Sequence, residues 1–268
     1  SQRTLPPNQA YLDARITSTD QHDWMIGSDF HALRSHKALS PKMRVPTHSH
    51  VFSDFNKLNR INPSDFVAIG SLAPGGLSNA WGCGVAKYSP NDLSAYPFPS
   101  SDLELSYRRV AKRIGISGSV NDDLSNYFSL DELAQPPIPI GKLQSNLYKR
   151  YLKHQPNLLK QGFRIGRSRV AVLSQDLKER QGCDLLDTCL WGCQRDSLYS
   201  ATQDIKSLKR NTNFDYRPGY LVENIGMDNT FRTISGHYKN LPFSIKSTRV
   251  ILAAGTLAST RIALAALN

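Results

Sequence analysis

Residues 74–84 read Pro-Gly-Gly-Leu-Ser-Asn-Ala-Trp-Gly-Cys-Gly, and this stretch narrows the fold and the function more than any other. Its four glycines, Gly75, Gly76, Gly82 and Gly84, let the backbone turn sharply and approach a flat or charged ligand, where a Cβ would collide. By composition alone, an ordinary surface loop is the simpler interpretation. A ligand-facing loop therefore needs support from elsewhere in the chain.

A second segment, residues 250–260, supplies that support. It reads Val-Ile-Leu-Ala-Ala-Gly-Thr-Leu-Ala-Ser-Thr. The apolar run predicts a short buried strand, Gly255 predicts a turn, and the residues after it predict the start of a helix. A glycine loop followed much later by a strand-to-helix glycine turn is a more specific pattern than either segment alone.

Together, the two segments resemble the glucose–methanol–choline (GMC) family of flavin oxidoreductases. Residues 75–81 are similar to the Gly-Gly-x-Ser-x-x-Trp/Asn loop that lies beside the flavin ring in that family. Residues 253–259 are similar to its Ala-Ala-Gly-x-x-x-Ser turn near the cofactor. The likeness extends over most of the chain from about Ser71, whereas residues 1–70 match only loosely.

The resemblance implies an α/β fold with α+β elements. It divides the chain into a polar, irregular segment at residues 1–70 and a GMC-like FAD-binding region at residues 71–268. The second region would include part of a substrate domain and a cysteine-bearing insertion at residues 180–200. The Gly-x-Gly-x-x-Gly fingerprint of a Rossmann βαβ unit does not occur in the sequence. We therefore expect an internal fragment of a longer flavoenzyme, with that unit and the C-terminal catalytic segment outside it.

The resemblance also assigns a set of FAD-binding positions. Glycines would let main-chain N–H groups approach the ring, Ser78 could hydrogen-bond to it, and Trp81 could pack on it. The backbone of Val222 would face adenine, although a simple core valine explains that position equally well. The predicted FAD-binding residues are Gly75, Gly76, Leu77, Ser78, Asn79, Ala80, Trp81, Val222, Ala254 and Gly255.

Ala80 bears on how the flavin is held. Some relatives attach the cofactor covalently through a His that immediately precedes the loop tryptophan. Here that position is Ala80, which carries no nucleophile. The sequence therefore predicts non-covalent FAD.

Three of the four cysteines, Cys183, Cys189 and Cys193, are spaced Cys-x5-Cys-x3-Cys. Three thiolates in a short, turn-rich segment can converge on one metal or cluster. Some bacterial GMC-type sugar dehydrogenases are similar here, which implies a 3Fe–4S cluster that passes electrons to a protein or quinone acceptor. Free thiols, or a Cys189–Cys193 disulfide, are the alternatives. An uneven group of three favours a reducing compartment, and we expect a cytoplasmic protein.

His48 and His50 would share one face of an extended segment, as two zinc ligands could. Further ligands cannot be named, so a solvated loop is the favoured interpretation.

The formal net charge is +11. The basic residues are dispersed rather than interleaved with aromatics on one stretch, so we expect no nucleic-acid partner. No apolar run is long enough to cross a membrane. The excess charge could favour an anionic substrate, an acidic partner or a membrane surface.

Apolar spacing and punctuation predict the remaining elements. Helices are expected from about residue 101 to Gly115, over Lys142–His154 with Pro156 stopping it, and over residues 197–210. Strands are expected at residues 66–69, 164–173, 220–225, 230–237 and 243–252.

The expected activity is hydride transfer from an alcohol group, on a sugar or polyol, to FAD. The resemblance to bacterial proteins associated with polysaccharide biosynthesis carries the choice of substrate, and no catalytic residue is assigned. The alternative is a non-enzymatic α/β module that binds an anionic partner through basic surfaces.

Overall fold

The computed structural model describes residues 13–14, 16–28, 30–34 and 40–267, and it shows an α+β protein with short helices and two small sheets. Helices near the N-terminus are α2 (Gln21–Met25), α3 (His31–Arg34), α4 (Ser49–Phe52) and α5 (Phe55–Leu58). The longer helices are α6 (Glu104–Ile114), α8 (Lys142–Lys160), α9 (Ala201–Leu208) and α10 (Thr256–Leu267), with a single turn at α7 (Ser125–Phe128). The sheets are β1 (Ile116–Ser117) with β2 (Ala134–Gln135), and β3 (Tyr220–Met227) with β4 (Arg232–Tyr238) and β5 (Leu241–Ser247).

Between these elements, the described part of the chain forms five 3-10 turns. Their bounds are η1 Pro41–Met43, η2 Pro46–His48, η3 Gly76–Asn79, η4 Ser100–Leu103 and η5 Asp131–Leu133. The strand expected at residues 66–69 does not form, and Phe66 and Val67 are exposed. An apolar run makes a strand only where a partner strand takes its hydrogen bonds, and the described chain offers none there.

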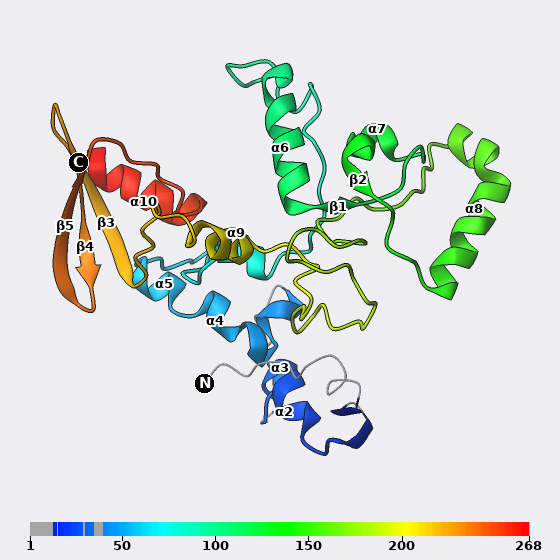
Figure 1. Ribbon diagram of the computed structural model, residues 1–268, viewed down its shortest axis with the longest axis horizontal. Helices are drawn as coiled ribbons and strands as arrows, with labels where there is room; N and C mark the ends of the chain where they lie inside the picture. Colours follow the sequence, from blue (N-terminus) through cyan, green and yellow to red (C-terminus); the bar gives the residue numbers. More distant parts are fainter. Residues whose placement is uncertain (1–12, 15, 29, 35–39, 268) are drawn as a thin grey trace.

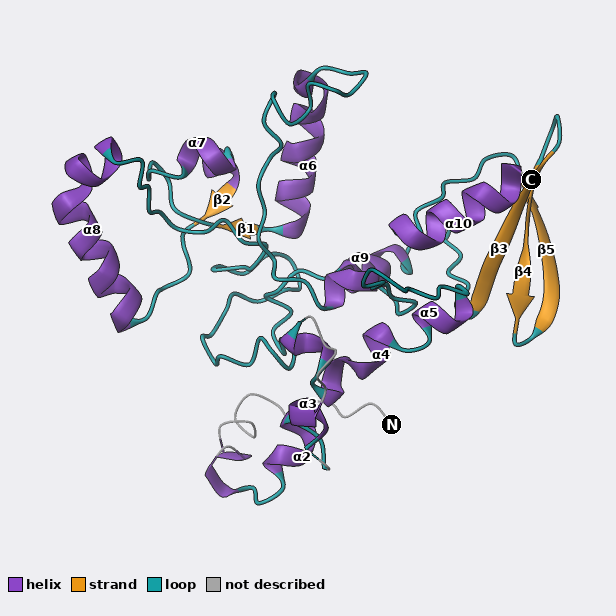
Figure 2. Cartoon of the chain, turned by 180° about the vertical axis from the view of Figure 1, so that it is seen from behind, coloured by secondary structure: helices purple, strands orange, loops and turns teal. Residues whose placement is uncertain are grey.

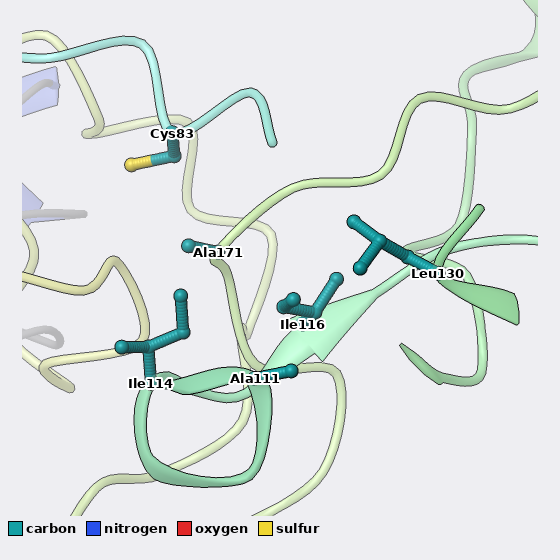
Figure 3. Close-up of a cluster of buried hydrophobic side chains, with 6 residues drawn as sticks. All are labelled: Cys83, Ala111, Ile114, Ile116, Leu130 and Ala171. Carbon is teal, nitrogen blue, oxygen red and sulfur yellow. The ribbon is translucent and has the colours of Figure 1, made fainter. Parts of the chain in front are cut away.

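The core of the middle region forms around α6. This helix ends where expected, because Gly115 follows it with φ +70°. Its inner residues Ala111 and Ile114 pack with side chains from distant segments (Figure 3). The cluster consists of Cys83, Ala111, Ile114, Ile116, Leu130 and Ala171. The end of the glycine loop is therefore built into this core through Cys83.

Residues 164–173 do not form the expected strand. Val170 and Val172 make only isolated bridges, to Gly84, Ser117 and Leu198. Backbone hydrogen bonds join the segment to these neighbours, but each pairs with it at a single bridge, so no continuous ladder forms. The guanidinium of Arg169, which is fully buried and lies 3.0 Å from the carboxylate of Asp122, adds an ion pair that holds the segment to another loop.

Helix α8 is longer than expected, because it continues through Pro156 to Lys160. An interior proline removes one backbone hydrogen bond but need not end a helix. Leu158 and Leu159, in the turn after Pro156, are half-buried, and this packing offsets part of that loss.

The larger sheet is an antiparallel meander in the order β3-β4-β5, with a register shift between Val222 and Asn224. Its first two strands match the sequence expectation closely. The third is shorter, since β5 ends at Ser247 rather than near residue 252. Helix α10 packs along β3, and Arg261 donates to the carbonyl oxygens of Val222 (3.0 Å) and Glu223 (3.4 Å).

Residues 250–254, expected as a buried strand, are neither buried nor paired in the described structure. The side chain of Ile251 is 92% exposed, and Leu252, Ala253 and Ala254 are also exposed. The turn and the helix after it are confirmed: Gly255 has φ +80°, and α10 begins at Thr256. As at residues 66–69, no strand in the described structure pairs with residues 250–254.

The elements are spread over an open shape. The sheet with α10 and the helix α8 lie at opposite ends of the molecule (Figures 1 and 2). The accessible surface is 18199 Å², whereas a compact monomer of 29.9 kDa exposes about 11,700 Å². Among the described helices, none is both long enough and apolar enough to cross a lipid bilayer.

Candidate functional site

The glycine loop at residues 74–84 folds tightly at its start. Gly75 and Gly76 have φ +86° and +58°, and the 3-10 turn η3 follows them. The hydroxyl of Ser78 turns back and donates to the carbonyl oxygen of Gly75 at 2.5 Å. Consecutive positive φ values are the conformation that the Gly-Gly pair allows at little cost.

The loop side chains hold the segment that leads into α9. The N–H of Ala201 donates to the Ser78 hydroxyl (2.9 Å), and the Ser200 hydroxyl donates to Oδ1 of Asn79 (2.7 Å). The indole N–H of Trp81 donates to the carbonyl oxygen of Tyr199 at 2.8 Å. Loop and helix start, about 120 residues apart in sequence, therefore form one hydrogen-bonded unit.

Ser200 explains why α9 begins where it does. Its side chain and that of Gln203 form a reciprocal capping box, so the helix starts at Ala201 instead of residue 197. The Thr202 hydroxyl lies 3.0 Å from Oδ1 of Asn79 and 3.2 Å from the carbonyl oxygen of Pro74. The Ser-x-x-Gln spacing is the sequence signal that could have located this helix start.

A cavity of about 260 Å³ lies against this unit. Four segments line it: the N-terminal turns, the glycine loop, the cysteine-bearing segment and the start of α9. The lining includes Lys42, His48, Ser78, Asn79, Trp81, Cys83, Cys189, Trp191, Cys193 and Tyr199. The structure thus brings the glycine loop and two of the three predicted cysteines to one place.

Cys83 is the cysteine that the sequence argument left without a role. It is buried, and removal from water raises the pKa of its thiol to about 11. The neighbouring Cys189 and Cys193 raise this pKa further, while Lys42 opposes them. At neutral pH Cys83 is therefore a protonated, weakly reactive thiol.

The three predicted cysteines are free thiols in the structure. Partial removal from water, together with Cys183 and Cys193, raises the pKa of Cys189. Backbone N–H groups point at two of the sulfurs: Leu185 N–H at Cys183 (3.4 Å) and Ser197 N–H at Cys193 (3.2 Å). Among the described residues, no group of three His, Cys, Asp or Glu side chains is placed to hold one metal ion.

His48 differs from the solvated histidine that the sequence favoured. It is 6% exposed, and burial followed by the charge of Lys42 lowers its pKa to about 4. A hydrogen bond with the Asn79 main chain acts in the opposite direction. Neutral His48 and the Lys42 ammonium, which donates to the Trp81 carbonyl oxygen at 3.0 Å, therefore brace the glycine loop.

Several glycines have open space where a side chain would stand. A Cβ at Gly76, Gly82, Gly84 or Gly255 would meet no atom within 4 Å. At Gly75 it would collide with the Thr202 hydroxyl. Gly75 thus serves the fold, whereas the other four leave bare backbone that a flat ligand could approach.

The remaining predicted positions lie away from this cavity. Val222 is in β3, where its carbonyl oxygen accepts from Arg261, and Ala254 and Gly255 precede α10. None of the three lines the cavity. Leu77 is 43% exposed, and Ala80 follows η3. The residues that sequence reasoning missed are Lys42, Cys83, Tyr199, Ser200 and Thr202.

Comparison with known proteins found no family model that matches this chain and no curated protein with significant similarity to it.

Proposed function

We propose that this chain is part of an FAD-dependent dehydrogenase that oxidises an alcohol group on a sugar or polyol. One observation carries the proposal. The glycine loop and the cysteine-bearing segment, about 100 residues apart, line a single cavity. These are the segments whose motifs resemble the GMC family, and a flavin beside a thiol-rich electron path requires them to be neighbours.

The loop geometry supports a planar ligand. Gly76 and Gly82 have open space where a Cβ would stand, and the φ of +58° at Gly76 favours glycine. The loop residues that line the cavity itself are Ser78, Asn79, Trp81 and Cys83. Ser78 and Asn79 are held by the start of α9, so their role is to keep the loop rigid against the ligand. Trp81 would contribute one wall. When bound, the flavin would accept the hydride from the alcohol carbon.

The thiols support a cluster in the same region. Cys83, Cys189 and Cys193 line the cavity, and Cys183 lies close enough to Cys189 to raise its pKa. Backbone N–H groups aimed at Cys183 and Cys193 suit ligating sulfurs, because such hydrogen bonds stabilise the thiolate form. In this proposal Cys183, Cys189 and Cys193, which are not placed to share one ion in the described structure, would converge to hold a 3Fe–4S cluster, and a protein or quinone would accept its electrons.

The open surface supports the view that more polypeptide packs on this chain. Residues 250–254 expose an uncharged apolar run with which no described strand pairs, and this is the composition of a strand inside a parallel sheet. In a longer flavoenzyme, neighbouring strands of a dinucleotide-binding unit would cover it. The catalytic base would also come from outside residues 1–268.

Absorbance of the purified full protein tests the proposal. We expect flavin bands in the native protein, and a colourless pellet with free flavin in the supernatant after acid precipitation, since Ala80 offers no attachment. Absorbance beyond the flavin bands that disappears in a Cys189→Ser variant would support the cluster. A native protein without bound flavin would contradict the proposal and favour the non-enzymatic module that binds an anionic partner.

A further inference from the structure

Helix α8 is the most isolated long element of the molecule. It lies at the end opposite the large sheet (Figures 1 and 2). Tyr151 is its one buried residue among those described. The Tyr151 hydroxyl and the Gln155 side chain both donate to Asp123, the latter at 2.8 Å. One face of α8 is thereby anchored, and the rest of the helix projects into solvent.

The exposed side of α8 carries an apolar stripe in its first half. Leu143, Leu147, Arg150 and His154 follow one another at helical spacing, so they share a face. Leu143 is 79% exposed and Leu147 is 59% exposed. Ile140 just before the helix and Phe163 just after it are exposed as well. Two leucines one turn apart are thus presented to whatever lies outside the molecule.

The charge around this stripe has one sign. Residues 133–175 contain eight Lys or Arg and no Asp or Glu, which accounts for most of the net charge of +11. Five of these basic residues lie in α8: Lys142, Lys149, Arg150, Lys153 and Lys160. Within the described part of the chain, none of these five forms an ion pair.

The combination of exposed leucines and basic residues distinguishes α8 from residues 250–254, which are also exposed and apolar. Residues 250–254 are uncharged and suit burial inside a protein core or interface, from whose centre charges are depleted. In α8 the leucines sit among lysines and an arginine, which is costly to bury between proteins without carboxylate partners. Such a mixture suits a bilayer surface, where leucines enter the acyl boundary and basic groups remain among headgroups.

We propose that α8 docks in the plane of a membrane whose headgroups are anionic. At 19 residues the helix is about 28 Å long, and Leu143 and Leu147 lie one turn apart on the same side of it. Leu143 and Leu147 would insert shallowly, while Lys149, Arg150 and Lys153 would contact phosphate and carboxylate groups of the lipids. This proposal is independent of the flavin proposal, because it concerns the opposite end of the molecule.

Co-sedimentation of the full protein with vesicles tests the inference, using phosphatidylcholine alone and phosphatidylcholine mixed with phosphatidylserine. We expect binding to the mixed vesicles only. The Lys149→Gln/Arg150→Gln variant should bind them about twenty-five-fold more weakly, at roughly fivefold per charge. The Leu143→Ser/Leu147→Ser variant should bind about tenfold more weakly, since the leucines no longer enter the acyl boundary.

Matched variants on α6 serve as controls. Arg109→Gln/Lys112→Gln removes the same charge, and Leu105→Ser removes an exposed leucine, from a helix whose Arg108 and Arg113 form ion pairs with Glu132 and Asp204. Both should bind mixed vesicles like the unaltered protein, and circular dichroism should show every variant folded. Three results would each overturn the inference: no vesicle binding, equal loss in the α6 variants, or charge-dependent binding that ignores the leucines. The last would show that only the basic residues contact the lipid and that the leucines do not insert.

Discussion

The two segments that carry the sequence argument, residues 74–84 and residues 250–255, have opposite fates in the structure. The first is clamped by His48, Lys42 and the start of α9 and continues into the core through Cys83. The second folds its turn and its helix but leaves Ile251 almost fully exposed. The difference lies in the neighbours: within the described residues, other segments hold the first segment in place, whereas no strand pairs with the second.

The largest effect should come from Gly75→Ala. The added Cβ would collide with the Thr202 hydroxyl and would hold a side chain at φ +86°. We expect the free energy of unfolding to fall by about 3 kcal/mol. Gly255→Ala is the matched variant, because its φ is similar but its surroundings are open. It should lose only about 1 kcal/mol in urea denaturation, and equal losses would show that the two segments are not differently packed.

A pH-dependent effect of similar size should arise at His48. Because its pKa falls from 6.5 to about 4 on folding, the unfolded chain binds the proton more tightly between these values. Stability is therefore complete above pH 6.5 and is lost as the pH falls toward 4. Between pH 7 and about pH 4.5 this residue should account for about 2 to 3 kcal/mol.

A His48→Gln variant isolates that contribution. Between pH 7 and about pH 4.5, the unaltered protein should lose about 2 to 3 kcal/mol more of its free energy of unfolding than the variant does. Urea denaturation at the two pH values measures both losses. Identical pH dependence in the two proteins would mean that His48 is not buried as a neutral group.

Asn79→Ala should have the next largest effect. Its Oδ1 accepts from Ser200, and its Nδ2 donates to the carbonyl oxygens of Pro74 (2.8 Å) and Gly76 (3.0 Å). Loss of these bonds should lower the free energy of unfolding by about 2 kcal/mol. Asn126→Ala on the exposed turn α7 provides the control and should change stability by less than about 0.5 kcal/mol.

The smallest effect, and the sharpest contrast, concerns Ile251→Ser. In this chain the Ile251 side chain is almost fully exposed. The free energy of unfolding, measured by thermal denaturation, should therefore change by less than about 0.5 kcal/mol. In a longer protein that covers this segment, the same change should cost about 2 to 4 kcal/mol. A negligible effect in both would leave residues 250–254 without a covering partner.

Local signals predicted the parts of the fold that depend on nearby residues. The end of α6 at Gly115, the strands β3 and β4, and the turn at Gly255 all follow from spacing and glycine chemistry. Strands at residues 164–173 and 250–254 were predicted wrongly, because a strand needs a continuous ladder and no local pattern reveals one. The first segment makes only isolated bridges, and no strand pairs with the second in the described structure. The predicted end of α8 was wrong, because packing of the last turn of the helix offsets the effect of Pro156.

The candidate site was predictable to a similar degree. Glycine content identified the loop, and cysteine spacing identified the second wall of the cavity. The contributions of Cys83 and His48 depend on contacts between segments that lie far apart in the chain, so spacing could not assign them. Ser200 was the exception, because the Ser-x-x-Gln spacing of its capping box can be recognised in the local sequence.

Two of the three tryptophans, Trp81 and Trp191, border the cavity, and both indole N–H groups are tied to backbone carbonyl oxygens. Their rings are thus fixed in orientation at the rim of the place where a chromophore would sit. Indole fluorescence overlaps the absorption of an oxidised flavin, so occupancy of the cavity should quench the intrinsic emission. Tryptophan emission could therefore report flavin binding during a titration with free flavin, without any added label.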